Sequence, residues 1–184
     1  MPTGQLPDKQ LLQEIIDFAK AQNILIVNDN PYSFILNDEP ISLFEFDKNK
    51  EVVVELNSLS KSHNMAGWRV GALIGAKEYI DVVMRFKSNM DSGMYKAVQI
   101  AAAQALSLDK NWFNYLNEIY KERKKVVKQI FDILDCSYEE DTAGLFVWAK
   151  APDYIADVPN WIDEILQKAK VFITPGFIFG TNGE

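Results

Sequence analysis

The residues best suited to chemistry lie in the stretch from Ser58 to Gly71. Lys61 stands there among small polar residues, and Arg69 follows eight positions later. A lysine amine in its neutral form is a nucleophile that can carry covalent catalysis. An isolated lysine is more often a solvated surface charge. The residues around Lys61 and the elements that carry it therefore decide between the two interpretations.

Two apolar runs precede these polar residues and predict the strands that position them. Residues 24–27 form a wholly apolar run, typical of a parallel strand covered on both faces, and residues 52–56 indicate a second buried strand. Asp29 follows the first run and Lys61 follows the second. Because ligands bind at the carboxyl ends of strands in an open parallel sheet, we expect Asp29 and Lys61 at one edge.

The stretch around Lys61 resembles the signature of the class I/II aminotransferases, which use pyridoxal phosphate. In that family three small or apolar residues precede the Schiff-base lysine, and an arginine, an apolar residue and a glycine follow at fixed spacing. These places are filled here by Ser58, Leu59, Ser60, Lys61, Arg69, Val70 and Gly71. A second block, from Asn28 to Tyr32, resembles the Asp-x-x-Tyr element of the same family.

The resemblance implies a role in cofactor chemistry for three residues. Lys61 would form a Schiff base with pyridoxal phosphate and then move protons at the substrate Cα. Asp29 would keep the pyridine nitrogen protonated, so that the ring can withdraw electrons. Tyr32 would hydrogen-bond the phenolate oxygen of the ring. Alone, Asp29 could equally be a turn residue ahead of Pro31.

The resemblance also implies a phosphate site. Arg69 would pair with the phosphate as a planar fork of donors, assisted by the hydroxyls of Ser58 and Ser60. Each residue also has a simpler interpretation, because loop hydroxyls often bond their own backbone and Arg69 could be a surface charge at the start of a strand. The joint order and spacing of the residues favour the family interpretation.

Composition narrows the other possibilities. The chain has 184 residues, of which 48% are hydrophobic, so it can bury a true core. A net charge of −7 without a basic patch argues against nucleic acid as a partner. Cys136 is the only cysteine and His63 the only histidine, which excludes an internal disulfide and a metal site of such residues. No apolar run approaches membrane-spanning length, and we expect a cytoplasmic protein without a membrane partner.

Periodicity and the resemblance together predict an α/β fold in two parts. Residues 1–110 would be the second half of the cofactor-binding large domain, a mainly parallel sheet flanked by helices. Residues 111–184 would be a linking helix and an incomplete α+β small domain. We expect helices near 8–19, 77–87, 97–106, 111–134 and 161–169, and strands near 24–27, 52–56, 69–75, 144–148 and 171–173.

The linking helix also has an alternative interpretation. Its basic residues could bind a membrane or a partner, but a helix that joins two domains with these residues on its solvated side fits better. They are Lys121, Arg123, Lys124, Lys125 and Lys128.

Both ends of the chain fall at family motifs. Met1 to Gly4 resembles the family's Asn-Pro-Thr-Gly with Met1 in place of the asparagine, and Thr174 to Gly180 resembles its Pro-Gly-x-x-Phe-Gly loop. The family's carboxylate-binding arginine would follow Glu184. We therefore interpret the chain as a fragment that has little transaminase activity alone. It should self-associate or pair with a complementary chain, whereas the full-length enzyme would be a homodimer.

The resulting functional hypothesis is transfer of an amino group from an amino acid to a 2-oxo acid. Met90 to Gly93, followed by Met94, resembles the branch with LL-diaminopimelate and aspartate aminotransferase-like proteins. A pyridoxal-phosphate decarboxylase or β-lyase would share the cofactor residues, and a non-catalytic remnant or interaction module is the alternative of another class. His63 matches no family position and is interpreted as a loop histidine.

Overall fold

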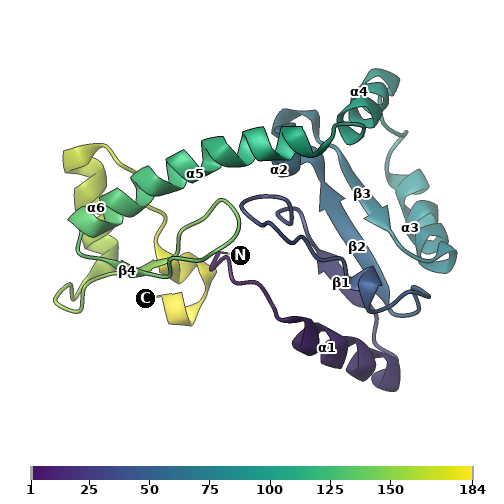
Figure 1. The fold of residues 1–184 in the computed structure, drawn as a ribbon, viewed down its shortest axis with the longest axis horizontal. Coiled ribbons are helices and arrows are strands. Elements are labelled where there is room, and N and C mark those ends of the chain that lie inside the picture. The colour runs from purple at the N-terminus through teal and green to yellow at the C-terminus, as the bar shows by residue number, and fades with distance from the viewer. Residues whose placement is uncertain (1, 184) are drawn as a thin grey trace. The chain divides into compact units, whose positions relative to one another are not determined.

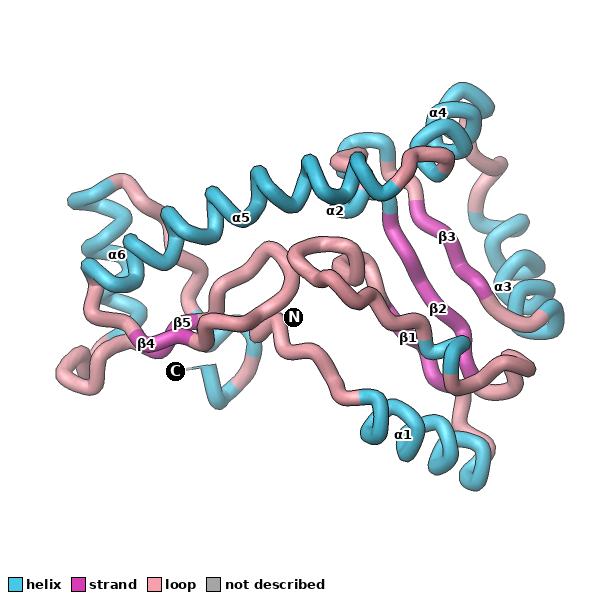
Figure 2. The backbone as a smooth tube through the Cα atoms, in the orientation of Figure 1, coloured by secondary structure: helices cyan, strands magenta, loops and turns pink. Residues whose placement is uncertain are grey.

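The computed structural model describes residues 2–183, so the predictions for Met1 and Glu184 lie outside the described residues. The chain divides into two compact units. The sheet unit comprises residues 6–120 and 143–145, and the C-terminal unit comprises the described remainder. Figures 1 and 2 label the helices and strands of both units. The division falls inside the long helix α5 (Lys110–Ile133), after Tyr120.

The sheet unit is built on three strands, β1 (Ile26–Asp29), β2 (Val53–Ser58) and β3 (Gly71–Ile74), in that order. β1 runs parallel to β2, and β3 runs antiparallel to β2. The combination of helices and sheet agrees with the predicted α/β class. One of the two strand pairings in the described sheet is antiparallel, however, whereas the sequence predicted a mainly parallel sheet.

Helix α1 (Lys9–Gln22) begins and ends where local chemistry dictates. The carboxylate of Asp8 accepts a hydrogen bond of 2.8 Å from the backbone N–H of Leu11, which caps the first turn. Asn23 adopts a left-handed conformation with φ of 52° and ends the helix. The buried stripe is narrower than predicted, because Leu11 and Ile15 are exposed.

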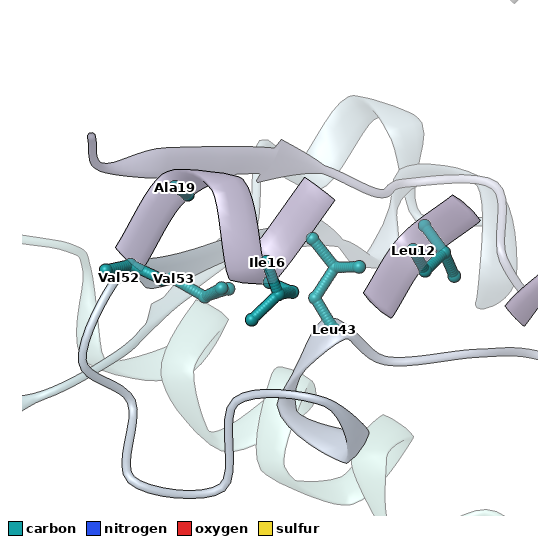
Figure 3. Close-up of a cluster of buried hydrophobic side chains, with 6 residues drawn as sticks. All are labelled: Leu12, Ile16, Ala19, Leu43, Val52 and Val53. Carbon is teal, nitrogen blue, oxygen red and sulfur yellow. The ribbon is translucent and has the colours of Figure 1, made fainter. Parts of the chain in front are cut away.

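The main core of the sheet unit lies between α1 and the sheet. Figure 3 shows Ile16 of α1 between Val53, which begins β2, and Leu43, which precedes it in the chain. The buried members are Leu12, Ile16, Ala19, Leu43, Val52 and Val53. Burial of these side chains fixes α1 on one face of the sheet only.

The other face of β1 corrects a prediction. The run 24–27 was expected to be covered on both faces, but Val27 is 57% exposed. Ile26 packs against the α1 core, and Val27 points to the opposite face because side chains alternate along a strand. Within residues 2–183, α1 is the helix that packs on this strand, so the second face stays exposed.

Besides the single turn α2 (Leu59–Ser62), the sheet unit contains α3 (Lys77–Met90), α4 (Lys96–Leu106) and the first half of α5. α4 contributes Ala102 to a second buried cluster with Leu59 and Val70. These two residues flank the lysine-bearing stretch, so α4 packs against the segment that carries Lys61. α3 has no buried residue and extends past its predicted end at residue 87.

The C-terminal unit contains a two-stranded sheet, β4 (Ser137–Tyr138) with β5 (Ala149–Lys150), and helix α6 (Val158–Ala169). The strands predicted at 144–148 and 171–173 are wrong. The backbone N–H of Gly144 donates to the carbonyl of Ile35 at 2.8 Å and is not available for a strand ladder. Residues 171–173 have no strand partner among the described residues.

Three of the five basic residues in the second half of α5 are exposed, as predicted for its solvated side: Lys121, Arg123 and Lys125. Lys124 and Lys128 are half-buried and depart from that prediction. The Lys124 amine donates to Thr142 Oγ1 at 2.8 Å, and burial together with the charge of Lys128 lowers the pKa of Lys124. The Lys128 amine pairs with Glu140 and lies 5.5 Å from the centre of the Tyr138 ring. These two lysines therefore tie α5 to the following segment. Between residues 2 and 183, none of the helices combines the length and the apolar character that a membrane-spanning helix needs.

Candidate active site at the edge of the sheet

Strand direction brings the predicted site residues to one edge of the sheet. Asp29 ends β1 and Ser58 ends β2, and the two strands are parallel. β3 is antiparallel and therefore starts at the same edge, where Gly71 pairs with Ser58. Figure 2 shows the turn of α2 (Leu59–Ser62), which carries Lys61, directly after β2 at this edge. The predicted placement of Asp29 and Lys61 on one edge is therefore observed.

The turn that carries Lys61 is held by a serine cap. Ser58 Oγ accepts a hydrogen bond of 3.1 Å from the backbone N–H of Ser60 and donates to the carbonyl of Val70 at 3.4 Å. Leu59 is buried in the cluster with Val70. Among residues 2–183, the half-buried Lys61 has no hydrogen-bond or ion-pair partner for its amine. The turn is thus held in place by its cap, while the Lys61 amine makes no hydrogen bond or ion pair with a described side chain.

A second set of contacts anchors the turn from the side of α5. The indole N–H of Trp112 donates to the carbonyl of Ser62 at 2.9 Å, and the rings of His63 and Phe113 meet edge to face at 5.4 Å. Ser62 Oγ donates to the Ser58 carbonyl at 3.1 Å and lies 2.8 Å from His63 Nδ1. Because a hydroxyl has one proton, Nδ1–H must be the donor in the second bond.

His63 lies in the turn that follows α2, as the loop interpretation predicted, but nothing in the sequence indicated that it is buried. It is only 9% exposed, and burial lowers the pKa of its imidazole below the ordinary value. The neutral ring stabilises the lysine turn through its hydrogen bond to Ser62, whose hydroxyl binds the Ser58 carbonyl. The family motif contains no signal for this role, because the ring that His63 meets, Phe113, lies far away in the sequence.

Arg69 lies at the same edge in an unusual backbone conformation. It follows the 3₁₀ turn Ala66–Trp68 with φ of 53°, is exposed, and donates one guanidinium N–H to the Ala66 carbonyl at 3.0 Å. A Cβ at Gly71 would lie 2.9 Å from the Asn57 carbonyl oxygen, too close for any side chain. Glycine there lets the segment after Arg69 lie directly against the end of β2.

Asp29 and Tyr32 occupy the end of β1 and the turn that follows. Asp29 is exposed. The backbone N–H of Asn30 donates to the Leu56 carbonyl at 2.9 Å, which extends the ladder past Asp29. Tyr32 is half-buried, and its carbonyl accepts the N–H of Ile35 at 2.9 Å. The backbone around Asp29 is thus tied to β2.

The predicted residues Asp29, Tyr32, Ser58, Ser60, Lys61 and Arg69 all belong to the sheet unit. A shallow hollow of about 330 Å³ lies elsewhere, in the C-terminal unit, and is lined by residues that include Thr3, Tyr138 and Trp148. It carries none of the predicted chemistry. The sheet edge therefore remains the candidate site, with an amine, a carboxylate and a guanidinium on neighbouring elements.

Curated relatives resemble the chain over its whole length. An LL-diaminopimelate aminotransferase of Dehalococcoides mccartyi is 37% identical over 185 positions, which cover 100% of this chain and 47% of that protein. The LL-diaminopimelate aminotransferase of Moorella thermoacetica is 35% identical, with the same shares covered. The chain thus spans about half the length of the curated relatives it matches.

Solved structures share the fold. BacF from Bacillus subtilis superposes with a TM-score of 0.90 at 35% identity, covering 99% of this chain and 47% of BacF. A probable N-succinyldiaminopimelate aminotransferase from Thermus thermophilus gives a TM-score of 0.88 at 28% identity, covering 99% and 49%. The family described as aminotransferase class I and II matches residues 1–184. The resemblance inferred from the lysine motif is thereby confirmed, and the chain belongs to the class I and II aminotransferases.

Proposed function

We propose that this chain is part of an enzyme that transfers an amino group from an amino acid to a 2-oxo acid with pyridoxal phosphate. The proposal rests on one observation: Asp29, Lys61 and Arg69 lie at the same edge of the sheet. Membership of the aminotransferase family supports it. The decarboxylase and β-lyase alternatives would use the same cofactor residues, but the names of the curated relatives favour the aminotransferase.

The donor set fits pyridoxal phosphate. Lys61 offers an amine without a described partner, Asp29 an exposed carboxylate, and Arg69 a guanidinium with most of its donors still available. Ser58 fits less directly, because its hydroxyl proton points to the Val70 carbonyl. We therefore assign to Ser58 first the capping of the lysine turn, and we assign to Ser60 the hydroxyl that would assist Arg69 in binding the phosphate.

Bound pyridoxal phosphate supplies an electron sink that makes the Cα–H bond of an amino acid acidic. Lys61 would hold the cofactor covalently and, once displaced by substrate, accept and return the proton at Cα. The Asp29 carboxylate would keep a proton on the ring nitrogen. Tyr32 would donate to the ring oxygen, and Arg69 would fix the phosphate as a charged fork.

The relatives extend the proposal to a substrate class and a setting. We place the parent enzyme in the branch of LL-diaminopimelate aminotransferases, acting in amino-acid biosynthesis in the cytoplasm as a homodimer. Residues 1–110 would then belong to the cofactor-binding domain and residues 111–184 to the linking helix and small domain. Exposed apolar side chains on α3, such as Val82, Phe86 and Met90, support association with further protein surface.

Titration with pyridoxal phosphate, followed by absorbance, tests the proposal. We expect binding by the chain and by the exposed-lysine control Lys48→Ala, and loss of binding by Lys61→Ala. With amino acids and 2-oxoglutarate, turnover should fall far below the roughly 10 per second of an ordinary enzyme. Binding that survives Lys61→Ala would contradict the assigned site, and carbon dioxide release from the amino acid would favour the decarboxylase.

A further inference from the structure

We propose that Glu55 is a positioning residue that holds the end of β1, and with it Asp29, in place for the cofactor; this rests on the proposed function of Asp29. Glu55 lies in β2 and is 8% exposed. A buried carboxylate is costly unless donors surround it. Its surroundings therefore identify the structure it maintains.

Three donors from two segments converge on this carboxylate. Oε1 accepts the backbone N–H of Leu43 at 2.6 Å and the side-chain amide of Asn28 at 3.0 Å. Oε2 accepts the hydroxyl of Ser42 at 3.0 Å. Asn28 belongs to β1, and Ser42 caps the 3₁₀ turn Leu43–Glu45. Glu55 thus joins the end of one strand to a turn that is distant in sequence.

Side-chain hydrogen bonds hold both sequence neighbours of Asp29, namely Asn28 and Asn30. Asn28 precedes it and is held by Glu55, while the side-chain amide of Asn30 donates to the Ile41 carbonyl at 3.4 Å. Asn28 and Glu55 are register partners, so both side chains lie on one face of the sheet. Asp29 then points to the opposite face. The clamp formed by Glu55, Asn28 and Ser42 lies behind the carboxylate and fixes the backbone that carries it.

A second buried carboxylate offers a matched control. Asp47 is fully buried, accepts the backbone N–H of Val52 at 2.9 Å and pairs with the Lys20 amine at 3.1 Å. Val52 precedes β2, so Asp47 acts at the sheet edge opposite to Asp29. Asp47→Asn should lower stability without a specific effect on the end of β1.

The variants follow from the hydrogen-bond chemistry. Glu55→Gln can keep the clamp, because its carbonyl accepts from Asn28 and Leu43 and its amide donates to the Ser42 hydroxyl. Glu55→Ala removes all three bonds, and Glu55→Asp keeps the charge but shortens its reach. If one of Glu55→Ala and Glu55→Asp fails to fold, the other can be used as the variant that disrupts the clamp.

Two readouts test the proposal: the dissociation constant for pyridoxal phosphate, and hydrogen exchange at the Asn30 amide. We expect Glu55→Ala to weaken binding roughly tenfold, as for loss of a hydrogen-bonded constraint, and to speed Asn30 exchange. Glu55→Gln and Asp47→Asn should do neither. In a double-mutant cycle, Glu55→Ala should weaken binding no further once Asp29 is already alanine.

The outcomes separate the two claims. Full additivity of Glu55→Ala and Asp29→Ala, or unchanged Asn30 exchange in Glu55→Ala, would overturn the inference. If Asp29→Ala leaves the affinity unchanged, or the chain does not bind pyridoxal phosphate, the function of Asp29 fails and the assignment of Glu55 to the cofactor site fails with it. In that case Asn30 exchange still decides whether Glu55 holds the strand end.

Discussion

The ends of β1 and β2 meet at one edge of the sheet but are held in different ways. Asp29, at the end of β1, is fixed by a buried carboxylate, Glu55, that gathers donors from Asn28 and from a distant turn. Lys61, after β2, is carried by a turn that Ser58 caps and that packs on α5 through Trp112. One end depends on a polar clamp and the other on a cap and aromatic packing.

This difference bears on how a cofactor site is built. The β2 end uses mostly neighbours in sequence, from Ser58 to Val70, so its design is visible as a motif. The β1 end uses partners many positions apart, such as Asn28 with Glu55. Because Glu55 is buried, loss of the clamp leaves donors without an acceptor and should lower the unfolding free energy more than loss of the cap. Variants at each end can test this order.

The largest effect on stability is expected at the clamp. Glu55→Ala leaves the buried N–H of Leu43 and the Asn28 amide without their acceptor. An unsatisfied buried group costs about 1–3 kcal/mol, so the unfolding free energy should fall by about 2–4 kcal/mol. Urea unfolding measures it, with Glu55→Gln as control. A loss below that of the β2-end variants would reverse the proposed order.

The next effect concerns the contact between α5 and the lysine turn. Trp112→Phe keeps an aromatic ring but removes the donor to the Ser62 carbonyl, so stability should fall by about 1 kcal/mol. The control is Trp68→Phe, because Trp68 is 50% exposed and its change should stay within about 0.5 kcal/mol. Equal losses in both variants would show that the Trp112 bond does not anchor the turn.

A similar or smaller effect is expected at the cap. Ser58→Ala removes the acceptor for the Ser60 N–H, which should cost about 0.5–1 kcal/mol because α2 is a single turn. Thermal unfolding measures the loss, and Ser58→Thr, which keeps the hydroxyl, should recover most of it. If Ser58→Thr behaves like Ser58→Ala, the hydroxyl is not the cap.

The smallest effect is a pH dependence from His63. Burial lowers the pKa of His63 below its ordinary value of 6.5, so the unfolded chain takes up the proton first as the pH falls. Stability due to the neutral ring is complete above 6.5 and is lost as pH falls from 6.5 through the folded pKa. His63→Gln should lack this dependence.

Proton NMR can follow the titration directly, because the chain has one histidine. The imidazole signals should give an apparent pKa below 6.5 in the folded protein. A value at or above 6.5 would show that the ring is more accessible than its contacts with Ser62 and Phe113 imply.

The sequence predicted what depends on local pattern. The apolar runs before Asp29 and Lys61 predicted two parallel strands ending at one edge, and Asp8 predicted the start of α1. It could not predict the clamp, since nothing in the pattern of β2 marks Glu55 as a partner of Asn28. It also missed the burial of His63, which depends on where α5 packs.

The errors have the same origin. Residues 144–148 have the composition of a strand, but Gly144 bonds to Ile35, and this tertiary contact outweighs local propensity. The run 24–27 is apolar enough for two covered faces, yet α1 supplies only one cover. Local pattern states what a segment can bury, whereas the packing partners decide what it does bury.

The central claim is that the turn after β2 carries the amine that bonds pyridoxal phosphate. Reduction of the mixture of chain and pyridoxal phosphate with borohydride, followed by peptide mapping, locates that amine directly. The account predicts a single labelled lysine, Lys61, and no label at saturation in Lys61→Ala. Label spread over several lysines, or retained in Lys61→Ala, would contradict it.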